Sequence, residues 1–229
     1  KMDASGLSIR NLSIYANNNA GIRIDGGSID IQENLIGVNA LGTNAGNIDM
    51  AVEHVGGNMT VNGNYIATNT DTGILIDAGT SNIIQNNHIT SNGDAACDDN
   101  ILISSGSGIT IQQNLIENAA SLGIDASATS GGLMISENTI TGSGQDGGNC
   151  GGSTEDMGIN LGGNNSQILN NIIHSNGGAG LATTGSGTGN LISQNSFYAN
   201  GTAGAALGID LNGDGVTLND SGDGDSGSN

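Results

Sequence analysis

A nine-residue repeat constrains the fold of this chain more than any other feature. The pattern I-x-x-N-x-I-x-x-N is complete at residues 31–39, and copies of it start at 9, 31, 61, 84, 111, 135, 168 and 192. The first Asn is kept in every copy after the first, as Asn34, Asn64, Asn87, Asn114, Asn138, Asn171 and Asn195. A unit of this length that returns so regularly predicts a solenoid, in which each unit stacks on its neighbours.

A second element follows each copy. It is a small residue and then two apolar positions separated by one residue, as in Gly21-Ile22-Arg23-Ile24, and residues 47–50 fit it in the second copy. This period of two predicts short strands with one buried face. Each copy is therefore expected to form several short strands and no helix, and the stacked coils to bury a column of Ile, Leu and Val.

The repeated Asn suits the bends of such a stack. Asn tolerates the left-handed conformation that a bend requires, and stacked Asn side chains can bond to one another. At residues 7–211 the chain resembles the right-handed parallel β-helix, the fold of the pectin-lyase-like group and of many bacterial surface proteins. The resemblance implies an all-β solenoid of about eight coils but no particular function. The expected division is an N-terminal segment (1–6), the β-helix (7–211) and an Asp/Gly-rich tail (212–229).

Charge excludes several partners. The chain has 3 Lys and Arg against 22 Asp and Glu, a formal net charge of −19. Nucleic acids and anionic membrane surfaces require clustered basic residues, so neither is an expected partner. No stretch is long and apolar enough to predict membrane insertion.

The connections between the repeat and the next strand alternate in length. Odd copies insert three residues, whereas even copies insert the longer stretches 40–46, 93–99, 144–157 and 201–207. This alternation indicates duplication of a two-coil unit, with all long loops leaving one side. Cys97 and Cys150 would then lie two coils apart, roughly 9.6 Å at the strand spacing of a sheet. We expect the loops to close this gap in a disulfide, typical of an oxidising extracellular compartment, the alternative being two unpaired thiols.

The same loops carry acids. Asp98 and Asp99 lie in one loop, and Glu155 and Asp156 in another. Paired carboxylates on neighbouring coils could catalyse glycoside hydrolysis, and polygalacturonase-like β-helices use clustered aspartates. The favoured interpretation is a solvated acidic loop, because aromatic residues that could hold a sugar are scarce.

One face of the predicted solenoid gathers the aromatic residues. The neighbours of the second Ile of each motif should point outward, and they include Tyr15, Tyr65, His88, His174 and Tyr198. Only Glu117 is charged among them, so the face is a candidate contact surface for a glycan or another protein chain. The alternative is ordinary β-propensity. His54, beside Glu53, is interpreted as part of a loop.

The tail contains a metal-binding pattern. Residues 210–215 match D-x-N-x-D-G, the opening of an EF-type calcium loop, although Ser221 stands where the closing Glu is expected. The candidate calcium ligands are Asp210, Asn212, Asp214, Asp220, Asp223 and Asp225. The alternative is an acidic linker. The tail also resembles a segment at the ends of β-helix regions in large bacterial secreted or surface proteins, which implies a module of a longer chain.

The sequence thus predicts a non-catalytic, extracellular structural or adhesive module of a surface protein or filament. Its expected partners are a polysaccharide, another protein chain, or copies of itself stacked end to end. The alternatives are a polysaccharide-active enzyme that uses the loop carboxylates, and a glycan-binding module.

Overall fold

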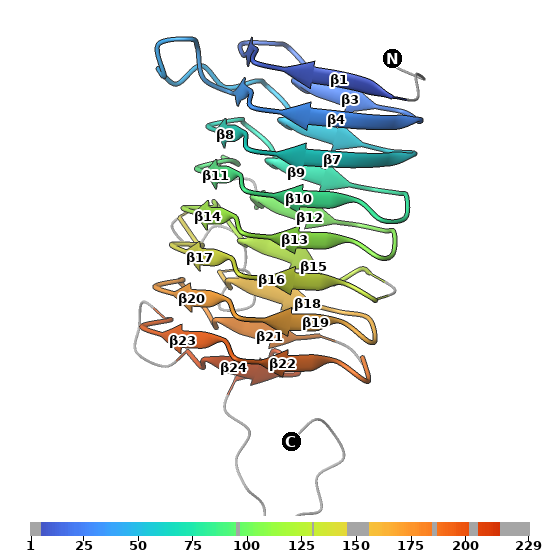
Figure 1. The fold of residues 1–229 in the computed structure, drawn as a ribbon. Helices are drawn as coiled ribbons and strands as arrows, with labels where there is room; N and C mark the ends of the chain where they lie inside the picture. Colours follow the sequence, from blue (N-terminus) through green and yellow to red (C-terminus); the bar gives the residue numbers. More distant parts are fainter. Residues whose placement is uncertain are drawn as a thin grey trace, which may run out of the picture.

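The computed structural model describes residues 6–94, 97–129, 131–145, 156–184, 187–201 and 206–215. These residues form 24 strands in three parallel sheets of eight strands each (Figure 1). The described part of the chain has no helix, and so none that could span a membrane.

The three sheets are named A, B and C. Sheet A contains β1 (Leu7–Arg10), β4 (Ser28–Gln32), β7 (Asn58–Asn62), β10 (Ile83–Gln85), β13 (Thr110–Gln112), β16 (Met134–Ser136), β19 (Gln167–Leu169) and β22 (Leu191–Ser193). Sheet B contains β2 (Ser13–Ile14), β5 (Leu35–Ile36), β8 (Tyr65–Ala67), β11 (His88–Thr90), β14 (Leu115–Glu117), β17 (Thr139–Thr141), β20 (Ile172–His174) and β23 (Ser196–Tyr198). Sheet C contains β3 (Ile22–Ile24), β6 (Val52–His54), β9 (Ile74–Ile76), β12 (Ile101–Ile103), β15 (Ile124–Ala126), β18 (Ile159–Leu161), β21 (Leu181–Thr183) and β24 (Ile209–Leu211).

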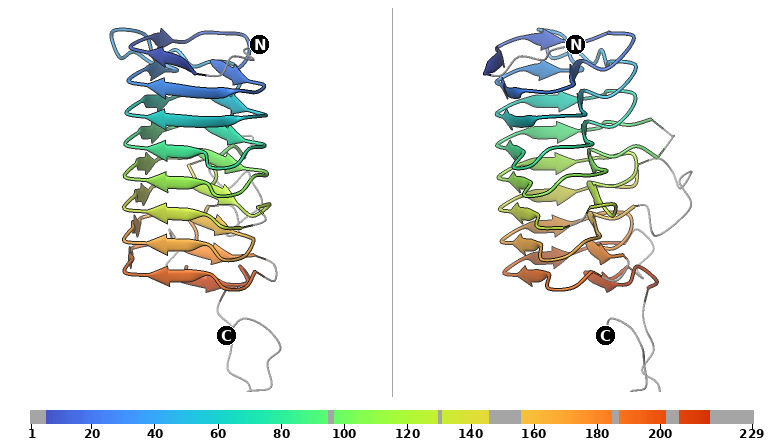
Figure 2. Two further views of the ribbon diagram at one scale, coloured as in Figure 1. Left: turned by 45° about the vertical axis from the view of Figure 1, so that its right-hand side comes forward. Right: turned by 90° about the vertical axis from the view of Figure 1, so that its right-hand side faces the viewer.

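The chain visits sheets A, B and C in turn, and each pass adds one coil to the stack (Figure 2). Equivalent residues of successive copies pair directly, so Val61 lies between Ile31 and Ile84 in sheet A. The predicted all-β, parallel β-helix of about eight coils is therefore confirmed. The long connections of the even copies all join sheet B to sheet C, as expected from their alternation.

The core is a column of aliphatic side chains. Ile31 of sheet A, Ile36 of sheet B and Val52 of sheet C all point inward and are fully buried. The inner coils repeat this arrangement, whereas the first and last coils bury the equivalent positions less completely. Burying one such side chain contributes about 1.5–3 kcal/mol. Because a single coil exposes both of its edges, this stabilisation depends on stacking.

The first Asn of each repeat forms a continuous hydrogen-bonded ladder, the first Asn ladder. In each step, the backbone N–H and side-chain amide of one Asn donate to the side-chain oxygen of the Asn in the next coil, at 2.8–3.0 Å. Its members are Asn34, Asn64, Asn87, Asn114, Asn138, Asn171 and Asn195. The predicted stacking of Asn side chains is confirmed.

The expectation that these Asn residues take the left-handed conformation is wrong. The left-handed residue is the one before each ladder position, with φ of 54° to 68°. These residues are Asn11, Glu33, Gly63, Asn86, Gln113, Glu137, Asn170 and Gln194. The preceding residue makes the turn, because the ladder Asn must direct its own N–H along the stack to the next coil.

A second Asn ladder follows sheet B. Asn17, Asn47, Asn69 and Asn92 bond in series, with side-chain amide to side-chain oxygen distances of 2.7–2.8 Å. Asn39, predicted for this position in the second copy, lies instead in a loop where its side-chain oxygen accepts the N–H groups of Leu41 and Thr43.

The strand predicted at residues 47–50 is also wrong. The chain leaves the coil after Gly37, whose carbonyl accepts the Ala45 N–H at 2.9 Å, and returns to it at Asn47. The strand of this copy is β6, and Ile48 is 62% exposed. The insertion therefore precedes the ladder position in this copy.

Because the insertion precedes the ladder position, His54 lies in β6 and not in the predicted loop. Its side chain is fully buried in the inward column of sheet C, between Ile24 and Ile76. Burial lowers the pKa of His54. The imidazole thus occupies a position that an aliphatic residue fills in the neighbouring coils.

Candidate functional site

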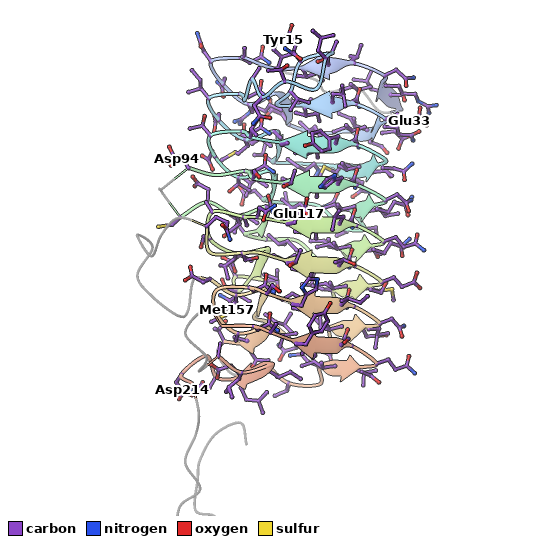
Figure 3. All side chains as sticks on the ribbon, turned by 90° about the vertical axis from the view of Figure 1, so that its left-hand side faces the viewer. Tyr15, Glu33, Asp94, Glu117, Met157 and Asp214 are labelled. Atoms are coloured by element: carbon purple, nitrogen blue, oxygen red, sulfur yellow. The ribbon has the colours of Figure 1, made fainter. Side chains whose placement is uncertain are left out.

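The outward face of sheet B carries the predicted aromatic surface. Figure 3 views the molecule from this side, with Tyr15 at the N-terminal end and Glu117 near the middle. The register places Tyr65, His88 and Leu115 in one outward column, and Glu117, Thr141 and His174 in a second.

Tyr65, His88 and Glu117 form one connected group. The rings of Tyr65 and His88 meet edge to face, with centroids 5.0 Å apart. His88 Nε2 lies 2.8 Å from Glu117 Oε1, so the carboxylate orients the imidazole. The only charged residue predicted for this face is thus engaged by a neighbour.

His174 and Tyr198 form a second group, nearer the C-terminal end. Their rings stack with centroids 4.6 Å apart and an angle of 4° between the planes. His174 Nδ1 lies within hydrogen-bonding distance of the hydroxyls of Thr141 (3.3 Å) and Ser175 (3.0 Å). Tyr198 is 51% exposed, so the pair presents an aromatic plane to solvent.

The remaining predicted member, Tyr15, directly follows β2. It is 44% exposed and lies on the first coil, away from both ring pairs. Ile172, beside the stacked pair, is 43% exposed. The face therefore holds exposed aromatic and apolar side chains along its length, with rings fixed by their neighbours in two places.

The loop carboxylates divide into different roles. Asp99 is buried, and its side chain accepts the Leu122 N–H at 2.9 Å, which ties this loop to the next coil. Asp98 lies beside Asp71, which the sequence reasoning did not single out. Asp156 is half-buried, and Glu155 lies outside the described residues. The predicted catalytic set is therefore described only in part.

The Asp98 carboxyl interacts with the Asp71 carboxyl. Burial, and then the negative charge of Asp71, raise the pKa of Asp98 to about 6. The protonated form of Asp98 can donate to Asp71, whereas two ionised carboxylates repel each other.

We expect Asp98→Asn to stabilise the protein at pH 7.5 but not at pH 4. A raised folded-state pKa contributes stability below the unfolded-state pKa, and this contribution is lost as the pH rises through about 6. The amide keeps a donor towards Asp71 at every pH. After allowance for solvent screening, the expected gain in melting temperature is about 2–4 °C, equivalent to about 1 kcal/mol.

Thermal unfolding followed by circular dichroism from pH 4 to 8 measures this difference. Asp30→Asn, on the outward side of β4, is the control and should leave the shape of the pH profile unchanged. If the melting temperatures of wild type and Asp98→Asn change in parallel with pH, the carboxyl pair contributes nothing to the pH dependence of stability.

Comparison with known families agrees with this geometry. Residues 2–160, more than half of the chain, match the family described as the right-handed beta helix region. The chain belongs to this family. The match confirms the predicted handedness, and no curated protein matches the sequence.

Within this β-helix, the cysteines and tail acids are only partly described. No cysteine among the described residues is free, but Cys150 lies outside them, so its pairing with Cys97 stays a prediction. Asp210, Asn212 and Asp214 are described together at the end of the last coil. Asp220, Asp223 and Asp225 lie outside the described part. Among the described residues, no group of three or more His, Cys, Asp or Glu side chains is placed so that it could hold a metal ion.

Sequence reasoning missed Asn47 and Asn100 as well as Asp71. Asn100 accepts the Asn92 amide at 3.0 Å and donates to the Glu117 carbonyl at 2.8 Å, so it replaces a ladder residue that the fifth copy lacks. The spacing to the next strand could have identified Asn47. Asn17 precedes the inward residue Ile22 by five positions, and Asn47 precedes the inward residue Val52 by the same number.

Proposed function

We propose that this β-helix is a non-catalytic, extracellular structural or adhesive module, and that the outward face of sheet B is its contact surface. The stacked His174–Tyr198 pair is the observation that carries the proposal. Its neighbours hold it in place, so little side-chain entropy is lost when a partner binds.

The chemistry of the face favours a neutral polysaccharide. Aromatic rings offer a broad apolar plane, and tyrosine adds a hydroxyl that can bond to a polar partner. The net charge of −19 opposes a polyanionic ligand. Coils that repeat at the spacing of β-strands, about 4.8 Å, place successive side chains in rows along which an extended chain can lie.

The extracellular assignment rests on the predicted pairing of Cys97 with Cys150. Such a bond would join two long loops on the sheet B to sheet C side and would persist only in an oxidising compartment. The proposed pairing is supported by the absence of a free cysteine among the described residues.

Tyr198→Ala is expected to weaken binding to a neutral polysaccharide about tenfold or more, the usual cost of removing an aromatic anchor from a contact surface. Affinity electrophoresis of the full chain against a panel of neutral and acidic polysaccharides measures this. The control is Met134→Ala, which removes an outward side chain of similar exposure from sheet A.

Equal binding by both variants would show that sheet B is not the contact surface. The wild type could instead bind no polysaccharide and form dimers or larger assemblies in light scattering. That result would favour self-association.

A polysaccharide-active enzyme is the second candidate function, and the raised pKa of Asp98 is the observation that favours it. A carboxyl that holds its proton to about pH 6 suits a general acid. An assay for new reducing ends with the same panel separates the two functions, because a binding module releases none and Asp98→Asn would abolish release by an enzyme.

A further inference from the structure

The carboxylate of Asp210 stands out at the C-terminal end of sheet C. Asp210 is the middle residue of β24 and is only 6% exposed. Its Oδ1 is buried and has no hydrogen-bond partner among the described residues. A buried carboxyl oxygen without a partner is unfavourable unless a donor, a positive group or a metal ion lies next to it.

The residues after β24 fold back over this carboxylate. Asn212, Gly213 and Gly215 have φ of 88°, 69° and 89°, so the chain turns sharply three times. The turn brings the Gly215 N–H to 3.0 Å from Asp210 Oδ2 and the Asn212 amide to 3.1 Å from Asp214 Oδ2. The loop thus gathers two carboxylates and an amide around one turn of backbone.

The loop is anchored to the coil before it. The Asn212 N–H donates to the Thr183 hydroxyl at 3.2 Å, at the end of β21. Gly213 lies against Thr184, where an added Cβ would be 3.4 Å from the Thr184 methyl group. These contacts hold the loop on the stack, so its oxygen atoms are organised before any ligand arrives.

No basic side chain of the described residues neutralises this loop. The chain has only three Lys and Arg residues, at positions 1, 10 and 23. Arg23 bonds to Asp25 and Glu53 in the first two coils, and Arg10 bonds to Ser8 in the first. The negative charge of Asp210 and Asp214 is therefore left to a cation from solution.

We propose that Asp210, Asn212 and Asp214 bind one calcium ion. Oxygen ligands at alternate positions, followed by a glycine at the turn, wrap a hard cation, and calcium accepts the irregular geometry and water ligands that magnesium tolerates poorly. The site contains two carboxylates and one amide, which is fewer charges than a tight calcium site has. Its expected dissociation constant is therefore about 10⁻⁴ to 10⁻³ M, the range of extracellular modules.

This site is independent of the proposed contact surface. Figure 3 shows Asp214 at the C-terminal end of the stack, away from Glu117 and Tyr15. Failure of polysaccharide binding would leave the calcium proposal untouched, and the converse also holds.

The test is a calcium titration of the ¹⁵N-labelled full chain, after treatment with a chelator, followed by amide resonances. The Gly213 and Gly215 amides are expected to shift and to saturate at about 10⁻⁴ to 10⁻³ M calcium. Asp214→Asn, an exposed change that should not disturb folding, is expected to weaken this response about tenfold or more, and Asp210→Asn to abolish it.

Asp125→Asn is the matched control. Asp125 occupies the same outward column of sheet C three coils earlier, and its carboxylate accepts the Ser127 N–H at 2.8 Å. This variant should keep the wild-type response. The proposal is overturned if the Gly215 amide does not respond, if Asp214→Asn responds like wild type, or if magnesium at the same ionic strength gives the same shifts.

Discussion

Asn87→Ala is expected to lower the free energy of unfolding by about 3–5 kcal/mol, because it interrupts the first Asn ladder in its middle. The Asn87 side chain is buried and donates to the Val61 carbonyl at 2.9 Å and to Asn114 Oδ1 at 3.0 Å. Its oxygen accepts both the N–H and the side-chain amide of Asn64, at 2.9 and 3.0 Å.

The Asn64 N–H carries much of the expected cost. After truncation it is left without its acceptor inside the stack, and an unsatisfied buried donor costs about 1–3 kcal/mol. The side-chain amide of Asn64 keeps other acceptors, the carbonyls of Ile31 and Asn62, so it loses less. The cavity left by the missing side-chain amide of Asn87 accounts for the rest of the expected loss of stability.

Asn86→Gly is the control for this prediction. Asn86 is the adjacent residue, is exposed, and has φ of 55°, which glycine adopts without strain. Its side chain makes one exposed bond, to Asn62 at 2.9 Å. Guanidinium unfolding followed by circular dichroism should separate the variants by at least about 2 kcal/mol. Equal stabilities would mean that the ladder is not a source of stability.

The regular part of the fold could be predicted because the repeat encodes it twice. The Ile positions specify the buried column, and each Asn position marks the residue after a bend, so the two signals support each other in most copies. They diverge in the second copy, where Asn39 satisfies the pattern in sequence but Asn47 bonds in the ladder. An insertion that itself contains an Asn at the expected spacing cannot be recognised from the motif alone.

The outward face of sheet B could be predicted for a similar reason, since side chains alternate between the inward and the outward side along each strand. What the sequence could not supply was pairing across coils. The stacking of His174 on Tyr198 and the bond from His88 to Glu117 join residues 24 and 29 positions apart. The Asp71–Asp98 contact depends on the path of an irregular loop, which has no period from which to infer it.

Gly37→Ala is the second change for which we expect a large loss of stability, at least about 3 kcal/mol. Gly37 has φ of 91°, and an added Cβ would lie 1.8 Å from the Ala67 carbonyl oxygen and 2.7 Å from the Asn69 amide. Neither atom can withdraw easily, because Ala67 belongs to β8 and Asn69 to the second ladder.

Gly37 itself is also fixed from several sides. Its N–H donates to the Ile14 carbonyl at 2.8 Å, and its carbonyl accepts the Ala45 N–H and the Thr68 hydroxyl, both at 2.9 Å. Moving the residue to relieve the overlap would therefore break the contacts that close the inserted loop.

Gly63→Ala separates this steric effect from backbone strain. Gly63 also has positive φ, 68°, but the nearest atom to an added Cβ is the side chain of Glu33 at 3.8 Å. Only the left-handed strain of about 1–2 kcal/mol is expected there. Chemical unfolding of both variants gives the difference, and amide exchange at Asn69 should accelerate in Gly37→Ala alone. If Gly37→Ala and Gly63→Ala lower the free energy of unfolding equally, the close approach of neighbouring coils does not limit which residue is tolerated at position 37.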